Sequence, residues 1–139
     1  MEEKIVIKIV LEMLGAPKEH VEETMKKVIE KMKETATVRE CNEFPAEKME
    51  DKPLFSTFTE AEVEFKDIEK VVGFCFDFMP SSVEVIHPTE LKMTGPNMNN
   101  FLNDILARLH QYDMVLKNVH AQNTLMKKEI ENLQEGKKN

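Results

Sequence analysis

The sequence predicts a small α+β head followed by one long C-terminal helix. Three observations support this prediction. Several short segments alternate between β-branched and polar residues, two amphipathic helical segments lie between them, and the hydrophobic period changes to a heptad from about residue 98. A chain of 139 residues, of which 41% are hydrophobic and 32% charged, can bury a core of this size.

The first part of the chain reads as strand, helix and strand. Residues 4–13, KIVIKIVLEM, alternate and are rich in β-branched residues, so they predict a strand that Gly15 should end. Pro17 fits the first position of a helix that continues to Glu34, because apolar residues recur on one side of it while glutamates begin it and lysines end it. Residues 35–44 predict a second strand.

The second part repeats the pattern after a polar connection over residues 46–53. Residues 55–66, FSTFTEAEVEFK, form the clearest predicted strand, in which Phe58 and three glutamates alternate with smaller or apolar residues. Asp67 should cap a helix over residues 67–79. The apolar stripe of that helix is predicted to comprise Ile68, Val71, Val72, Cys75, Phe76 and Met79.

The stretch GFCFDFMPSSVEVIHP, residues 73–88, holds Cys75, Asp77, Ser81 and His87, which are the residue types of a nucleophilic active site. A cysteine on an apolar helix face is more often structural. We therefore interpret Cys75 as a core residue, Pro80 as the end of the helix, and residues 81–88 as a short final strand. On this interpretation the protein is not an enzyme.

The predicted order is strand, helix, strand, strand, helix, strand. Two right-handed crossovers in this order give the ferredoxin-like split βαβ sandwich, with four antiparallel strands and both helices on one face. We therefore predict a ferredoxin-like head over residues 1–90, a linker over residues 91–97, and a coiled-coil dimerisation helix over residues 98–136.

The C-terminal helix carries the most specific pattern in the chain. Its heptad a positions are Leu102, Leu109, Leu116, Asn123 and Ile130, and its d positions are Ile105, Tyr112, Val119, Met126 and Leu133. Ten consecutive seam positions without a stutter predict a coiled coil, and a single asparagine at an a position favours a parallel, in-register dimer. In such a homodimer Arg108 at g would face Asp113 at e of the second copy.

The alternative is that this stripe packs on its own head. Phe101 and Leu106 widen the apolar face near the start of the helix, whereas beyond Tyr112 the stripe narrows to the a and d positions. We therefore expect the root of the helix to contact the head and its distal part to pair two copies.

Charge and composition exclude several classes of protein. The net charge of −7 is concentrated in residues 1–97, with 13 basic and 21 acidic residues, against 6 basic and 5 acidic in residues 98–139. Such a head should not bind nucleic acid directly, because phosphate contacts need clustered Lys and Arg. No apolar run is long enough to cross a membrane, and charges near the start spoil a signal peptide, so we expect a cytoplasmic protein.

Cysteines and histidines give no further site. Cys41 and Cys75 lie far apart and are expected to be free thiols. The four histidines, His20, His87, His110 and His120, show no metal-ligand spacing, so we expect no metal and no cofactor.

One loop resembles a known regulatory module. The segment MLGAPKEHVEE, a strand running through a glycine into a helix, looks like the ligand-binding loop of ACT-type regulatory domains, which are ferredoxin-like and bind small molecules such as amino acids. The resemblance implies that Gly15, Ala16 and His20 would contact the ligand. Turn geometry explains the glycine as well. The whole chain is similar to small uncharacterised archaeal proteins with a ferredoxin-like head and a C-terminal coiled coil, a similarity that implies no activity.

These inferences lead to three hypotheses of function. The leading one is a non-enzymatic homodimeric adaptor or scaffold whose acidic heads are held in register by a parallel coiled coil and which binds another protein, with a basic protein compatible with the charge. The second is an ACT-like small-molecule sensor. The third is a ribosome-associated factor that uses its dimer to block or bridge subunits.

Overall fold

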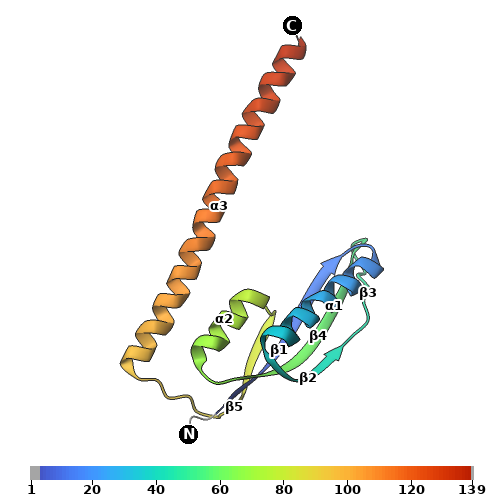
Figure 1. Ribbon diagram of the computed structural model, residues 1–139. Coiled ribbons are helices and arrows are strands. Elements are labelled where there is room, and N and C mark those ends of the chain that lie inside the picture. Colours follow the sequence, from blue (N-terminus) through green and yellow to red (C-terminus); the bar gives the residue numbers. More distant parts are fainter. Residues whose placement is uncertain (1–3, 139) are drawn as a thin grey trace. The chain divides into compact units, whose positions relative to one another are not determined.

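A computed structural model describes residues 4–138 and shows an α+β head and a long C-terminal helix (Figure 1). The elements in chain order are β1 (Ile5–Gly15), α1 (Lys18–Thr35), β2 (Thr37–Glu43), β3 (Glu47–Lys48), β4 (Phe55–Phe65), α2 (Ile68–Phe78), β5 (Ser82–His87) and α3 (Gly95–Lys138). The chain divides into two units between Thr94 and Gly95, and each is described by itself.

The head is built on a five-stranded antiparallel sheet. Its strand order is β2-β4-β1-β5, and the short β3 pairs with the start of β4. The two long strands β1 and β4 pair over their full lengths, with Ile7 opposite Val63 and Ile9 opposite Ala61. The alternation predicted for both strands is confirmed, because their odd-numbered residues share one face of the sheet.

Both helices of the head pack on that same face, since one hydrophobic cluster joins them to the odd-numbered strand residues. The cluster comprises Ile5, Ile7, Ile9, Leu11, Met25, Ile29, Met32, Ala61, Val63, Phe65 and Phe74. The amphipathic face predicted for α1 is therefore confirmed, with Val21, Met25, Ile29 and Met32 all buried.

The predicted apolar stripe of α2 is partly wrong. Phe74 is the buried residue of this helix, and Ile68, Val71, Cys75 and Phe78 pack against the core, so the stripe does not run through Val72, Phe76 and Met79. Nearly every residue from 71 to 79 is apolar, and so the sequence leaves the rotation of the helix undetermined. The large rings take the inner side: Phe74 lies edge-on to Phe65 at a centroid distance of 5.2 Å, and 4.8 Å from Phe78.

The ends of helices α1 and α2 are set by residues next to them in the chain. The predicted cap is confirmed, because the Asp67 carboxylate accepts a hydrogen bond from the Lys70 backbone N–H at 2.9 Å. At the other end of α2, Met79 adopts a left-handed conformation with φ of 48° and is 69% exposed. Gly15 is the last residue of β1, so the strand continues two residues beyond the predicted range, and Pro17 is the N-cap of α1 rather than its first residue.

Two boundaries differ from the prediction. The connection over residues 46–53 contains β3, a two-residue strand too short to show any periodicity in sequence. Helix α3 begins at Gly95, inside the segment predicted as linker, and Pro96 then lies in its first turn, where a missing backbone N–H costs no helical hydrogen bond.

Both outer strands of the sheet carry an extra residue. The pairing of β2 with β4 shifts register between Val38 and Glu40, so that Arg39 has no opposite residue. On the other edge, Val6 is opposite His87 and Ile7 is opposite Val85, which leaves Ile86 of β5 without one. Such bulges twist a strand locally and interrupt its ladder.

Candidate functional site

The heptad stripe of α3 is the largest candidate surface. All ten predicted seam positions lie on this one uninterrupted helix, which is about 66 Å long at 1.5 Å per residue. In the single chain the seam residues are exposed, apart from the half-buried Ile105. The exposed fraction reaches 67% at Leu116 and 63% at Leu133, which is high for leucine.

Asn123 lies within this stripe, one turn after Val119 and just before Met126, and it is exposed as they are. Near it the Thr124 hydroxyl donates to the His120 carbonyl oxygen at 3.0 Å, an ordinary intrahelical bond. The Asn123 amide therefore interrupts an otherwise apolar stripe at one level.

The two charged residues predicted to pair between copies both have a partner within their own helix. The Arg108 Nε lies 3.5 Å from Asp104 Oδ2, and the Lys117 Nζ lies 2.8 Å from Asp113 Oδ2. A pair between Arg108 and Asp113 of a second copy would have to replace or share these i,i+4 contacts. The ion pairs within one helix and the pair between two copies are all exposed and differ little in free energy. The contact between Arg108 and Asp113 of a second copy therefore contributes little to the preference for a parallel over an antiparallel pair.

The predicted ligand loop has a structural explanation. A Cβ placed on Gly15 would lie 3.2 Å from Val21 Cγ2, so the glycine permits close packing of β1 against α1. The backbone N–H groups of His20 and Val21 donate to the Pro17 carbonyl oxygen at 3.1 and 3.2 Å, which begins the helix. Neither of the two cavities described next is lined by Gly15, Ala16 or His20.

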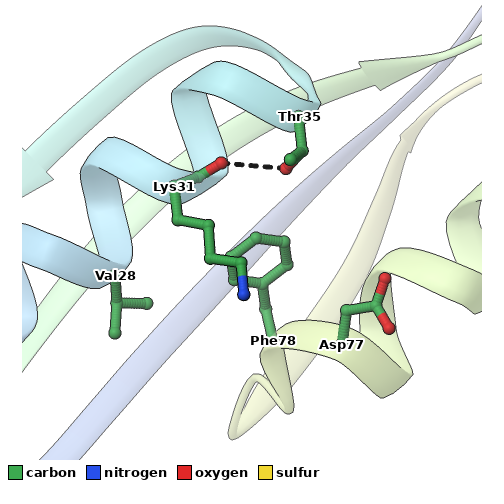
Figure 2. Close-up of a pocket in the computed structure, with 5 residues that line it drawn as sticks. All are labelled: Val28, Lys31, Thr35, Asp77 and Phe78. Carbon is green, nitrogen blue, oxygen red and sulfur yellow. Dashed lines mark hydrogen bonds between the residues drawn. The ribbon is translucent and has the colours of Figure 1, made fainter.

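A groove of about 470 Å³ lies between α1 and α2 (Figure 2). Val28, Lys31 and Thr35 line it from α1, and Asp77 and Phe78 line it from α2. The Lys31 ammonium, the Asp77 carboxylate and the side chains of Val28 and Phe78 therefore border the groove, and the Thr35 hydroxyl donates to the Lys31 carbonyl oxygen at 2.9 Å. Sequence reasoning missed this groove because it depends on how two helices are spaced.

A smaller cavity of about 180 Å³ lies between α1 and the end of β2. Glu22, Met25, Lys26, Glu43, Phe44, Pro45 and Thr57 line it. At its rim the Glu22 carboxylate accepts a hydrogen bond from the Ala46 backbone N–H at 3.3 Å, which ties α1 to the chain after β2. This acidic side chain therefore has a structural role.

The residues of the stretch 73–88 have separate surroundings. The Ser81 hydroxyl and backbone N–H both donate to the Val10 carbonyl oxygen, at 3.1 and 2.8 Å, and so fix the turn before β5. Cys75 packs against the core, Asp77 borders the groove, and His87 lies opposite Val6 at the end of β5. These positions support the structural interpretation of the stretch.

Both cysteines are free and half-buried. Burial raises the pKa of the Cys75 thiol. Burial is also the main cause of the raised pKa of Cys41, which nearby Lys33 opposes and Glu43 reinforces. A raised thiol pKa lowers the fraction of reactive thiolate at neutral pH, which is the opposite of what a nucleophile requires.

Within residues 4–138, no three His, Cys, Asp or Glu side chains gather into a metal-binding group. Over the same part of the chain, no helix is long and apolar enough to cross a membrane.

Comparisons with known proteins address the chain as a whole. Comparison with curated proteins and with solved structures gave no match. The model of one family, described as the MJ0538 family, matches residues 6–139, a range that includes nearly all of the head and the whole of the C-terminal helix. The chain therefore belongs to the MJ0538 family.

Proposed function

We propose that this protein is a non-enzymatic scaffold or adaptor: a ferredoxin-like head that a parallel coiled coil of two α3 helices assembles into a homodimer. The observation that carries the proposal is the heptad stripe of α3, which spans four and a half heptads, is apolar except at Asn123 and is exposed in the single chain except at the half-buried Ile105. Apolar residues at the a and d positions are those that a second helix covers in a coiled coil.

The head supports the ferredoxin-like part of the proposal through its strand order. Helix α1 connects β1 to β2 and helix α2 connects β4 to β5, and the sheet order is β2-β4-β1-β5. A split βαβ sandwich has this order, with its first and third long strands in the centre. The short β3, which pairs with β4, is then an addition to this order.

The free energy available from burying the seam side chains supports the association of two α3 helices. Eight seam side chains per helix are between 44% and 67% exposed. Burying the remainder of each contributes about 1 kcal/mol, so a dimer gains on the order of 15 kcal/mol, against a cost of about 4–15 kcal/mol for lost freedom. The surplus is modest, and we expect a dimer whose population depends on protein concentration.

Asn123 supports the parallel orientation. In a parallel, in-register pair its amide meets the same amide of the second copy, whereas in other arrangements it faces an apolar residue. Two heads held at the same end of such a pair would bind a partner bivalently, which multiplies weak affinities.

Two leucines of α3 provide a matched test. Leu116 at position a and Leu125 at position c are 67% and 66% exposed in the single chain, so that only their heptad positions distinguish them. We expect Leu116→Asp to shift the full-length protein to monomer and Leu125→Asp to leave it a dimer, as measured by sedimentation equilibrium over a range of concentrations. A monomeric wild type, or equal effects of both variants, would contradict the coiled-coil proposal.

A further inference from the structure

The face of the sheet opposite α1 and α2, which we call the open sheet face, presents the even-numbered residues of β1 and β4. The odd-numbered residues of these strands form the core with both helices of the head. Neither α1 nor α2 therefore lies on the open sheet face (Figure 1).

Charged residues cross the middle of this face on four neighbouring strands, with glutamates on β2, β4 and β5 and a lysine on β1. Glu40 of β2 is directly opposite Glu62 of β4, and Lys8 of β1 lies between Glu62 and Glu84 of β5. Glu60 and Glu64 flank Glu62 on the same side of β4, and Glu64 Oε1 lies 3.7 Å from Lys4 Nζ. Like charges directly opposite each other weaken a sheet, so this row carries a cost that a cationic partner would remove.

One end of the same face carries exposed apolar side chains beside Glu12, which is opposite Phe58. Leu14 of β1 and Phe58 of β4 are 53% and 42% exposed there. Exposed large apolar side chains that gather beside polar ones are typical of surfaces that bind other proteins.

We propose that the open sheet face binds a basic amphipathic segment of a partner protein. Lysine or arginine side chains of the segment would meet the glutamates, and its apolar side chains would cover Phe58 and Leu14. The carboxylates would repel nucleic acid and anionic lipid. Residues 98–139 have nearly balanced charge, so the chain's own helix is a poorer match than a basic segment.

This inference names the partner class of the proposed scaffold, and bivalent binding rests on that proposed function. The open sheet face itself lies within a single chain. The two can fail separately. Sedimentation of Leu116→Asp tests the dimer, and peptide binding per chain tests the open sheet face in either state of association.

The probe is a labelled peptide with lysines on one side of a helix and leucines on the other, titrated into the full-length protein by fluorescence anisotropy. A second peptide keeps the lysines and replaces the leucines by serine. We expect saturable, salt-sensitive binding of both peptides. Glu60→Gln with Glu62→Gln should weaken both by about tenfold, and Phe58→Ala should weaken the leucine peptide alone by about fivefold.

Two control variants make the same kinds of change away from the open sheet face: one removes the same number of negative charges, and the other removes one exposed apolar side chain. Glu19→Gln with Glu30→Gln, on exposed positions of α1, should change the affinity less than about twofold, and so should Leu91→Ala, which removes a leucine that is 42% exposed outside the sheet. Circular dichroism checks that each variant is folded.

Three results would overturn the proposal. One is absence of saturable binding, and another is an equal loss in the α1 control. The third is that Glu60 and Glu62 resist carbodiimide labelling in the free full-length protein and that adding the peptide does not change the extent of labelling. This result would mean that the same chain or a second copy covers the open sheet face.

Discussion

Two threonines of β4 have the same burial but different hydrogen bonding. Thr57 is 2% exposed, and its hydroxyl donates to the Phe44 carbonyl oxygen at 2.6 Å. Thr59 is fully buried, and its Oγ1 has no hydrogen-bond partner among the described residues. A buried polar group without a partner costs free energy, whereas one with a partner contributes a little.

Valine, which has nearly the shape of threonine, separates these two cases. We expect Thr59→Val to raise the free energy of unfolding by about 1 kcal/mol, because it removes an unsatisfied hydroxyl, and Thr57→Val to lower it by about 1 kcal/mol. Urea unfolding followed by circular dichroism measures both. Equal losses in the two variants would show that the Thr59 hydroxyl is satisfied.

The thiols give a second prediction for single residues. Burial raises the pKa of both Cys75 and Cys41, so each should react more slowly with a disulfide reagent at neutral pH than it does in the urea-unfolded chain. The rate should climb with pH until the pH passes the raised pKa, since the thiolate is the reacting form. Reaction of native Cys75 as fast as in the unfolded chain would revive a chemical role for it.

At the scale of elements, helix α2 shows how packing selects a rotation that its sequence leaves open. Phe74 is 6% exposed and contacts the rings of Phe65 and Phe78, whereas Phe76 is only half-buried and is not part of the core cluster.

Truncating the two rings to leucine therefore has unequal effects. We expect Phe74→Leu to lower the free energy of unfolding by roughly 1–2 kcal/mol and Phe76→Leu by well under 1 kcal/mol, because only the first leaves a gap in the core. Thermal unfolding of the two variants compares them directly. A larger loss for Phe76→Leu would favour the stripe through Val72, Phe76 and Met79.

Periodicity predicted those elements whose two faces differ in polarity. In β4 and α1 most residues of the outer side are polar, and in β1 Lys8 and Glu12 mark that side, so both the type of element and its buried face followed from sequence. β3 is too short to have a period, and α2 is apolar around most of its circumference. The groove beside Lys31 and Asp77, and the row of glutamates and Lys8 across four strands, depend on spacing and register that only the folded chain fixes.

For the whole molecule, if two copies pair through α3 as proposed, Asn123 tests their orientation. In a parallel pair the two residues at this position meet, so Asn123→Cys should form an interchain disulfide efficiently under mild oxidation, which non-reducing electrophoresis and peptide mass spectrometry detect. The same substitution at Leu125, on the outer side of the helix, is the control and should cross-link poorly. An intact dimer that forms no bond through position 123 would exclude the parallel register.

The two residues without an opposite residue in the outer strands, Arg39 and Ile86, affect whether the sheets of neighbouring heads can pair edge to edge. If α3 pairs two chains, it holds two sheets at high local concentration, where exposed strand edges would invite one sheet to grow onto the next. Arg39 in β2 and Ile86 in β5 each break the regular row of backbone donors and acceptors that an incoming strand would need. The heads should therefore remain separate folding units and resist fibril growth, even while their helices associate.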